Sequence, residues 1–285
     1  IISDIKFFRD KIDAVLFHEL CYQNFFHYII YSITDPTHIT LFTLIEKLIY
    51  NYIKKMKQID KNSFIKNGYI ILENIIKPNQ LNKIDSSSKL LMQSFKKNSV
   101  WDISHHGRKF INNRCEKYSA LNRFAKGKIT KNIAQQLLGK EKVYLFNEQL
   151  VTKAPNSKSS FSWHQDSGYV GFKHEPYISI WLAIDDSLEK NGALSIIPTK
   201  INRNTKVLKH NWSEKTKDLH LKINNKKTAL CEVKKGSVVV FSSLTPHSSG
   251  NNLTNKTRRA YLCQYTPFPI INKVTGIQNG RALLI

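Results

Sequence analysis

Cysteine, acidic residues and long apolar runs are all scarce in this chain of 285 residues. Its four cysteines, Cys21, Cys115, Cys231 and Cys263, lie far apart and include no CxxC pair. This spacing excludes a disulfide-rich secreted scaffold and predicts a reducing, cytoplasmic location. Because the chain begins at Ile1, a targeting segment removed from its start stays open as an alternative.

Uninterrupted apolar segments are short. The longest candidates, 25–33 and 38–50, are interrupted by His, Thr, Glu or Lys. A membrane-spanning helix needs about 18 or more consecutive, mostly apolar residues, so the sequence predicts no membrane association. Hydrophobic residues still make up 41% of the chain, which supplies a large core and excludes a disordered protein.

Acidic residues number only 21 against 44 Lys and Arg, so the formal net charge is +23. A basic surface attracts nucleic acids and other anions. However, 36 of the basic residues are Lys and eight are Arg, and Asn and Ile are also abundant. This composition is typical of an AT-rich genome. Dispersed, solvated Lys therefore explains most of the charge, and nucleic acid is an unfavoured partner.

The hydrophobic pattern changes near residue 60. Within 1–60, apolar residues such as Leu41, Leu44 and Leu48 recur at helical spacing, which predicts a helical extension packed on the core. We expect the main domain to span 61–285. It should begin with a short strand after a turn at Asn67 and Gly68, followed by a helix.

After Lys140 the sequence becomes rich in short β-patterned runs, and no long helical pattern interrupts them. The runs are Val143–Val151, Tyr177–Ile184, Ala193–Ile197, Ala229–Val233, Ser237–Phe241 and Arg259–Thr266. Such a succession is typical of an antiparallel sandwich or barrel rather than of alternating βαβ units. Helices are expected near Pro78 and at 128–139. The fold class predicted is mainly β with flanking helices, an α+β arrangement.

A basic segment at about 200–235 separates two of these runs. It contains 11 basic and three acidic residues, a local net charge of +8. We interpret it as an insertion between barrel strands, either a solvated loop or a lid over the substrate. In the second case its charge would act on an anionic small molecule or on an acidic carrier protein.

The HxD motif formed by His164 and Asp166 is the sharpest chemical feature. Residues two apart on an extended segment project to the same face, so one imidazole and one carboxylate point to a single place. His247, which follows a predicted strand, is the candidate for a third ligand. Two histidines and one carboxylate on one face of a metal leave three positions open, as in non-haem Fe(II) oxygenases.

Arg258 opens the last predicted strand and shares its face with Ala260 and Leu262. A charge on an otherwise apolar inward face needs an anion, because an unpaired buried charge is costly. The guanidinium fork fits a carboxylate through two parallel hydrogen bonds. This indicates a small dicarboxylate co-substrate that also chelates the metal.

Five stretches, in order, are similar to one known family: FIKNGYIILENII, WHQDSGY, ISIWLAIDDSLEKNGALSIIP, KKGSVVVF and HSSGNNLTNKTRRAYLCQY. Over about 64–268 the chain resembles the phytanoyl-CoA dioxygenase (PhyH) family of Fe(II)/2-oxoglutarate oxygenases. The resemblance implies a double-stranded β-helix, which is a squashed antiparallel barrel of the cupin type with helices along one side.

The resemblance also implies roles for single residues. The three candidate ligands match the iron ligands of the family, and Arg258 matches the residue that binds the distal carboxylate of 2-oxoglutarate. Ser249 matches a hydroxyl that contacts the same carboxylate. Trp181 matches an aromatic residue that lines the co-substrate pocket, although a core position is the alternative for a Trp on a barrel strand.

Substrate contacts are expected from residues beside the open metal positions. Phe161 and Tyr169 flank the HxD motif, and His105 and His106 lie in a region that often walls the pocket in this family. Surface placement is the alternative for each of them. After Pro198 the chain departs from the family pattern, so the substrate of any one member is not transferred to this chain.

These features together predict an oxidoreductase, an Fe(II)- and 2-oxoglutarate-dependent dioxygenase that uses O2 and releases succinate and CO2. Its expected reaction is hydroxylation, desaturation or oxidative cyclisation at an unactivated C–H bond of a small-molecule metabolite, as in secondary metabolism. Halogenases on this scaffold replace the carboxylate ligand, so the presence of Asp166 disfavours halogenation.

Several alternatives stay open at this point. The substrate could be an acyl-CoA, a carrier-bound group or a protein, and the barrel could bind a metal or ligand without turnover. A nucleic-acid demethylase of the alkylation-repair type typically has a second Arg six positions after the first. Here that position is Gln264, which disfavours this reading.

Overall fold

The computed structural model describes residues 59–96, 102–224 and 226–285. The helical extension predicted at 1–60 lies almost entirely outside these residues, so it stays a prediction, as does the domain boundary placed after it. From Ile59 onward the chain forms one compact unit. No helix in the described part of the chain is long and apolar enough to cross a membrane.

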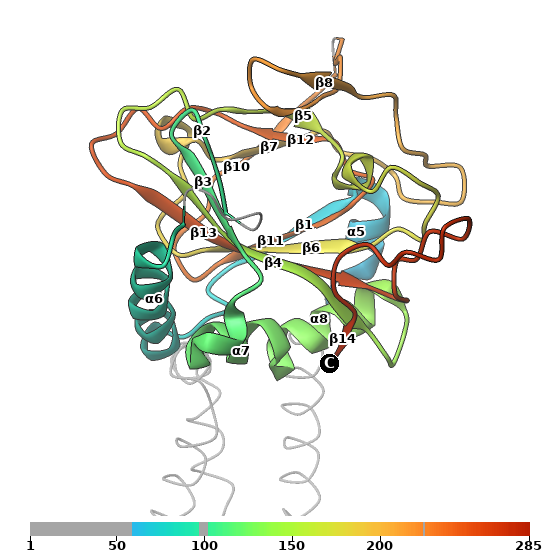
Figure 1. Ribbon diagram of the computed structural model, residues 1–285, viewed down its shortest axis with the longest axis horizontal. Coiled ribbons are helices and arrows are strands. Elements are labelled where there is room, and N and C mark those ends of the chain that lie inside the picture. The colour runs from blue at the N-terminus through green and yellow to red at the C-terminus, as the bar shows by residue number, and fades with distance from the viewer. Residues whose placement is uncertain (1–58, 97–101, 225) are drawn as a thin grey trace, which may run out of the picture. The chain divides into compact units, whose positions relative to one another are not determined.

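Two antiparallel sheets form the centre of the fold (Figure 1). Residues from both sheets line a cavity. The larger sheet has eight strands, of which seven follow one another in space and the eighth pairs with β4. In spatial order they are β1 (Tyr69–Leu72), β11 (Val238–Ser242), β6 (Ile178–Ala183), β13 (Arg258–Thr266), β4 (Tyr144–Lys153), β3 (Arg108–Asn112) and β2 (Asp102–His105), with β14 (Leu283–Leu284) beside β4.

The smaller sheet has four strands and closes the other side of the cavity. In spatial order they are β10 (Ala229–Cys231), β7 (Leu194–Ile196), β12 (His247–Ser249) and β5 (Phe161–His164). The basic segment 200–235 follows β7 and includes β10, and the part between these two strands contains a separate two-stranded hairpin. This hairpin consists of β8 (Asn211–Ser213) and β9 (Asp218–His220) and lies above β5 in Figure 1.

Helices cover the outer face of the larger sheet. The described α-helices are α5 (Lys61–Asn67), α6 (Pro78–Gln93), α7 (Ser119–Lys126) and α8 (Lys128–Leu138), and the 3₁₀ helices are η2 (Cys115–Lys117), η3 (Asp166–Tyr169) and η4 (Glu189–Asn191). Figure 1 shows α6, α7 and α8 below this sheet, on the side away from the smaller one. Pro78 stands in the first turn of α6, where its missing N–H removes no helical hydrogen bond.

The pleat of each strand in the larger sheet divides its side chains between two environments. On β13, Tyr261, Cys263 and Tyr265 pack with the helices, whereas Ala260 and Leu262 pack between the two sheets. The helix side is a large apolar core. The side between the sheets combines a smaller apolar cluster with the polar residues of the cavity.

Each of the six predicted β-runs overlaps a strand, and the antiparallel barrel-like fold is confirmed. The helices expected near Pro78 and at 128–139 are also present, as α6 and α8. The strands β2 and β3 and the helix α7 are not among the elements predicted from the sequence. The two strands lack a clear alternation of buried and exposed residues. β3 pairs with β4, and β2 pairs with β3 at the edge of the sheet, so tertiary pairing specifies both strands.

Three cysteines lie among the described residues, and all are buried and free. Burial raises the pKa of Cys115 to about 11, with Glu148 adding to the effect, and that of Cys231 to about 12. Burial and Glu148 also raise the pKa of Cys263 well above its ordinary value. All three thiols are therefore protonated at neutral pH.

A pair of Leu→Ala substitutions tests the assignment of the core. Leu150 on β4 is fully buried, so Leu150→Ala should lower the free energy of unfolding by about 2–5 kcal/mol through lost burial and a residual cavity. Leu230 on β10 is 44% exposed, so Leu230→Ala should cost less than about 1 kcal/mol. Urea unfolding followed by circular dichroism measures both. Equal losses would contradict the assignment.

Candidate active site

Strands β5 and β12 bring two histidines and one aspartate to a common point. β12 pairs antiparallel with β5, so that His247 lies opposite His164. Nε2 of His164 lies 3.6 Å from Oδ1 of Asp166, and Nε2 of His247 lies 3.5 Å from the same oxygen. All three side chains are buried, and their candidate ligand atoms lie within 4.8 Å of one another. Residues distant in the sequence therefore meet through strand pairing.

Asp166 does not lie on an extended segment, contrary to the sequence prediction. β5 ends at His164, Gln165 is still extended with φ −111° and ψ 135°, and Asp166 begins η3. The bend is held by the Gln165 side chain, whose Nε2 donates to Leu244 O at 2.6 Å and whose Oε1 accepts from Leu208 N at 2.7 Å. His164 and Asp166 still point to the same side, because the backbone stays extended through Gln165 and bends only from Asp166 onward.

Each histidine is oriented by a carbonyl group behind it. Nδ1 of His164 lies 2.7 Å from Ser162 O, and Nδ1 of His247 lies 3.0 Å from Thr245 O. A carbonyl oxygen can only accept a hydrogen bond, so in both rings Nδ1 carries a hydrogen and is the donor. The lone pair of each Nε2 is then directed toward Asp166, where a metal would bind.

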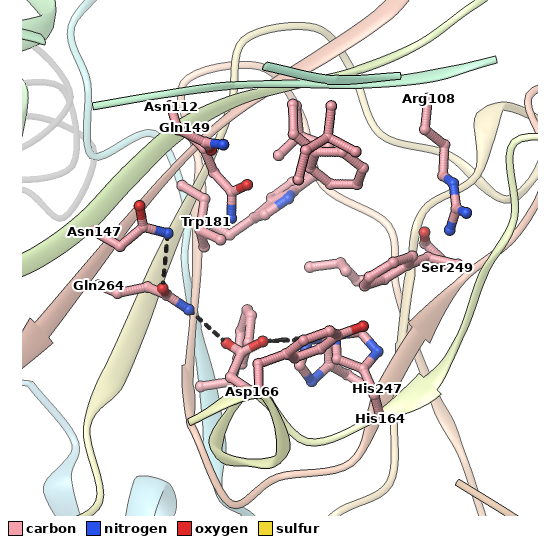
Figure 2. Close-up of a pocket in the computed structure, with 18 of the residues that line it drawn as sticks. Arg108, Asn112, Asn147, Gln149, His164, Asp166, Trp181, His247, Ser249 and Gln264 are labelled. Carbon is pink, nitrogen blue, oxygen red and sulfur yellow. Dashed lines mark hydrogen bonds and ion pairs between the residues drawn. The ribbon is translucent and has the colours of Figure 1, made fainter. Parts of the chain in front are cut away.

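The second carboxylate oxygen of Asp166 is held by two residues that the sequence analysis missed. Ser179 Oγ donates to Oδ2 at 2.6 Å and Gln264 Nε2 donates to it at 3.0 Å. Gln264 in turn accepts a hydrogen bond from Asn147 at 3.1 Å (Figure 2). Gln264 stands on the same face of β13 as Arg258, so strand alternation was the one signal that could have identified it.

Burial and neighbouring groups set the charge of this cluster. Burial by itself would raise the pKa of Asp166, but His247, His164 and Ser179 outweigh it and lower that pKa to about 2. Burial and the nearby His164 lower the pKa of His247 to about 4. At neutral pH the cluster thus offers a carboxylate and a neutral His247 ring. A donor set of two imidazoles and one carboxylate fits Fe(II).

Arg258 is a buried cation whose hydrogen-bond acceptors are neutral. Its side chain is 2% exposed, its Nη2 donates to Gly192 O at 2.7 Å, and its guanidinium lies 5.3 Å from the centroid of the Trp181 ring. Burial lowers the pKa of Arg258 to about 10, with Asp185 acting in the opposite direction, so the group is charged at neutral pH. Such a group is suited to bind an anion.

A cavity of about 650 Å³ between the sheets contains all but one of the predicted site residues (Figure 2). Its lining includes His164, Asp166, His247, Ser249, Arg258, Trp181, Phe161, Tyr169 and His105. His106 is the exception. Its Nε2 lies 2.6 Å from Lys215 O, so it joins the β2–β3 turn to the β8–β9 hairpin and does not line the cavity.

Two aromatic residues pack around His164 at the cavity wall. The ring of Phe161 meets that of His164 edge-on, with centroids 4.3 Å apart, and Tyr169 does so at 5.6 Å. The hydroxyl of Tyr169 accepts a hydrogen bond from Leu219 N at 3.0 Å, which ties η3 to β9. These rings limit the access of water to one side of the cluster.

The basic segment 200–235 contacts the metal-site loop directly. Nε2 of His210 accepts a hydrogen bond from Gln165 N at 3.0 Å, next to the HxD motif. Trp212 and Lys217 of the same segment line the cavity. Part of the segment therefore forms the cavity wall, and its action as a lid stays a prediction.

Known proteins are similar to this chain in sequence and in fold. The family model for phytanoyl-CoA dioxygenase (PhyH) matches residues 64–260, well over half of the chain, which confirms the predicted resemblance. A curated relative, the 2-aminoethylphosphonate dioxygenase of an uncultured bacterium (HF130_AEPn_1), is 27% identical over 165 residues. The match covers 54% of this chain and 57% of that protein, so it spans little more than half of the relative's length.

Solved structures support the fold. The epimerase SnoN, determined with Fe3+, alpha ketoglutarate and nogalamycin RO, superposes with a TM-score of 0.60 at 13% identity, covering 78% of this chain and 92% of SnoN. EctD from S. alaskensis, determined with 2-oxoglutarate and 5-hydroxyectoine, gives a TM-score of 0.58 at 19% identity, covering 72% and 74%. EvdO2 from Micromonospora carbonacea gives 0.55 at 22% identity, covering 72% and 89%.

Removing the amide that holds Asp166 should weaken metal binding. Gln264→Leu deletes the hydrogen bond to Oδ2, so the carboxylate is less well oriented, and we expect the affinity for Fe(II) or Co(II) to fall about 10- to 100-fold. Anaerobic calorimetric titration of the metal-free protein measures this. Gln149→Leu, an amide of the same cavity on β4, is the matched control and should change the affinity little. Equal losses in both variants would contradict the role of Gln264.

The buried Lys153 should make the protein more stable at alkaline pH. Burial, then Arg258 and Arg108, lower the pKa of Lys153 from 10.5 to about 6. Between these values the unfolded chain binds a proton that the folded chain does not, so stability rises with pH, by up to roughly 1.4 kcal/mol per unit. Urea unfolding at pH 7, 8 and 9 should show this slope. Lys153→Met should flatten it, and Lys235→Met, at an exposed site, should not.

Proposed function

Because this chain belongs to the phytanoyl-CoA dioxygenase family, we propose that it is an Fe(II)- and 2-oxoglutarate-dependent dioxygenase that oxidises a C–H bond of a small molecule. One observation supports this above all others. A buried His-Asp-His cluster and a buried arginine with neutral partners share a single cavity. The cluster is a donor set for Fe(II), and the arginine suits a carboxylate.

His164, Asp166 and His247 would hold the iron on one face. These side chains are already oriented before a metal binds. Backbone carbonyls fix both imidazole rings, and Ser179 and Gln264 donate hydrogen bonds to Oδ2 of Asp166. When bound, iron supplies the O2 chemistry that converts 2-oxoglutarate to succinate and CO2 and oxidises the substrate. The protein contributes ligands, orientation and a site shielded from water.

Arg258 is proposed to bind the distal carboxylate of 2-oxoglutarate. Its guanidinium is already fixed by Gly192 O and by the face of Trp181, so little side-chain entropy is lost on binding. The fork leaves N–H groups for a bidentate contact with a carboxylate. Ser249 lines the same cavity and supplies a hydroxyl donor.

The substrate class that we infer is a small anionic metabolite. Besides Arg258, the positively charged side chains that line the cavity are those of Arg108 and Lys217, whereas Asp166 is the one acidic residue of the lining among the described residues. The curated relative is named for 2-aminoethylphosphonate, a small phosphonate, which supports the same class. Hydroxylation, desaturation and cyclisation all begin with removal of one hydrogen and are all compatible with this site.

Other functions have less support. Halogenation needs the metal carboxylate replaced, whereas Asp166 is present and oriented. A nucleic-acid demethylase is disfavoured because Gln264, in place of a second arginine, is bonded to Asp166. An acyl-CoA or carrier-bound substrate would have to enter past the basic segment 200–235. A barrel that only binds a ligand, without catalysis, does not need three metal ligands and a buried arginine in the same cavity.

Anaerobic titration with Fe(II) and 2-oxoglutarate tests the proposal. The wild-type protein should develop a visible charge-transfer band, and Asp166→Ala should lose it, because one ligand is missing. Arg258→Lys should raise the Kd for 2-oxoglutarate about 10-fold or more, since a lysine lacks the fork. Arg259→Lys, the neighbour on the opposite face of β13, is the control and should leave this Kd unchanged. A wild-type protein without the band would refute the assignment.

A further inference from the structure

Arg108 is a second buried arginine of the cavity, and the proposed reaction gives it no role. It begins β3 and is 2% exposed, and Figure 2 shows its side chain extending into the cavity. Nη1 donates to Asp218 Oδ2 at 2.8 Å, and Nη2 donates to Thr216 O at 2.7 Å. Among the described residues, Nε has no acceptor. A buried donor of this kind is uncommon and is ready to bind a ligand.

Arg108 and Arg258 stand on different strands and lie over different aromatic rings. β4 lies between their strands, and Lys153 pairs in register with both of them. The two backbones are thus two strand spacings apart, about 10 Å. The guanidiniums also lie over different rings, Arg108 at 4.8 Å from the centroid of Phe161 and Arg258 over Trp181. Arg108 therefore marks a separate corner of the cavity.

The corner at Arg108 is close to the metal cluster. Phe161 contacts both, because the Arg108 guanidinium lies 4.8 Å from the centroid of its ring and the ring centroid of His164 lies 4.3 Å from that centroid. A small molecule held at Arg108 would thus extend past a single aromatic ring to reach the cluster. This spacing suits a substrate with a charged end and a reacting carbon a few bonds away.

Other positive or titratable groups surround this corner. His105 at the end of β2 and Lys217 from the β8–β9 turn line the cavity. Burial, then Arg108, His106 and Lys217, lower the pKa of His105, as expected in a positive local field. The hydrogen bond between His106 and Lys215 O joins the β2–β3 turn to the β8–β9 turn. The corner thus combines a histidine that ends β2, an arginine that begins β3 and a lysine of the β8–β9 turn.

We propose that Arg108, with His105 and Lys217, binds the terminal oxyanion of the primary substrate and places its reacting carbon at the metal cluster. The substrate is then a small molecule ending in a phosphonate, a phosphate or a carboxylate. This inference rests on the proposed function, in which Arg258 is already committed to 2-oxoglutarate.

The variants must remove the arginine without leaving a buried charge. Arg108→Met alone would leave Asp218, which is 1% exposed, without its ion pair. The double variant Arg108→Met/Asp218→Asn avoids this. Arg108→Lys is a second variant that keeps the charge and loses the fork. Lys109→Met, on the exposed face of β3 next to Arg108, removes the same charge outside the cavity and is the control.

Calorimetric titration with inorganic phosphate, methylphosphonate and acetate measures binding, using protein loaded anaerobically with Fe(II) and 2-oxoglutarate. We expect the Kd of the preferred probe to rise at least 10-fold in the double variant and less in Arg108→Lys. Lys109→Met should stay within twofold of wild type, as should the Kd of 2-oxoglutarate in every variant. Preference for phosphate and methylphosphonate would identify a tetrahedral oxyanion, and preference for acetate a carboxylate.

Three results would separate failure of this inference from failure of the proposed function. No binding of any probe, or equal binding by wild type and the double variant, would overturn the role of Arg108. A parallel loss of 2-oxoglutarate affinity would also overturn it, since Arg108 would then belong to the co-substrate site. If wild type fails to bind Fe(II) and 2-oxoglutarate but metal-free protein shows the Arg108-dependent phosphate binding, the anion site stands and the proposed function fails.

Discussion

The pleat of the larger sheet is the constraint on which the remaining structure depends. Each strand has to bury an apolar face against the helices and present its other face to the cavity. On β13 the first requirement is met by Tyr261 and Tyr265, and the second by Arg258 and Gln264. The stability of the sheet and the chemistry of the site are therefore specified by alternate residues of the same short segments. A shift of one residue in register would exchange the two faces and destroy both.

The sequence was sufficient for the parts of the site that have a chemical signature. An HxD motif, a later histidine and an arginine opening a strand are rare enough in combination to point to one chemistry. Gln264 and Ser179 escaped notice because an amide and a hydroxyl on a strand have no such signature. Arg108 escaped because its partner, Asp218, is 110 positions away and its strand lacks clear alternation. The bend at Asp166 depends on contacts of Gln165 with two other segments, which no local pattern predicts.

In the structure, the positions of a few basic residues matter more than the net charge of +23. Arg258 is buried in the cavity with neutral hydrogen-bond acceptors, whereas the buried Arg108 is ion-paired with Asp218 and keeps an Nε donor that has no acceptor among the described residues. A buried charge without a counter-ion and a buried donor without an acceptor are both costly, so their retention indicates a ligand more strongly than many exposed lysines do. The basic segment 200–235 matters through its position rather than its total charge, since it supplies Lys217 to the cavity lining and Asp218 as the ion-pair partner of Arg108.

The buried cysteines have a consequence for an iron site that activates O2. Such a centre releases oxidants whenever turnover is uncoupled from the substrate, and thiolates are the side chains that react first. Cys115, Cys231 and Cys263 are inaccessible, and burial keeps them as thiols. Cys231 lies in the apolar cluster between the two sheets, near the cavity, yet it has the properties of an inert core residue. The described part of the fold thus has resistance to self-oxidation built into its packing.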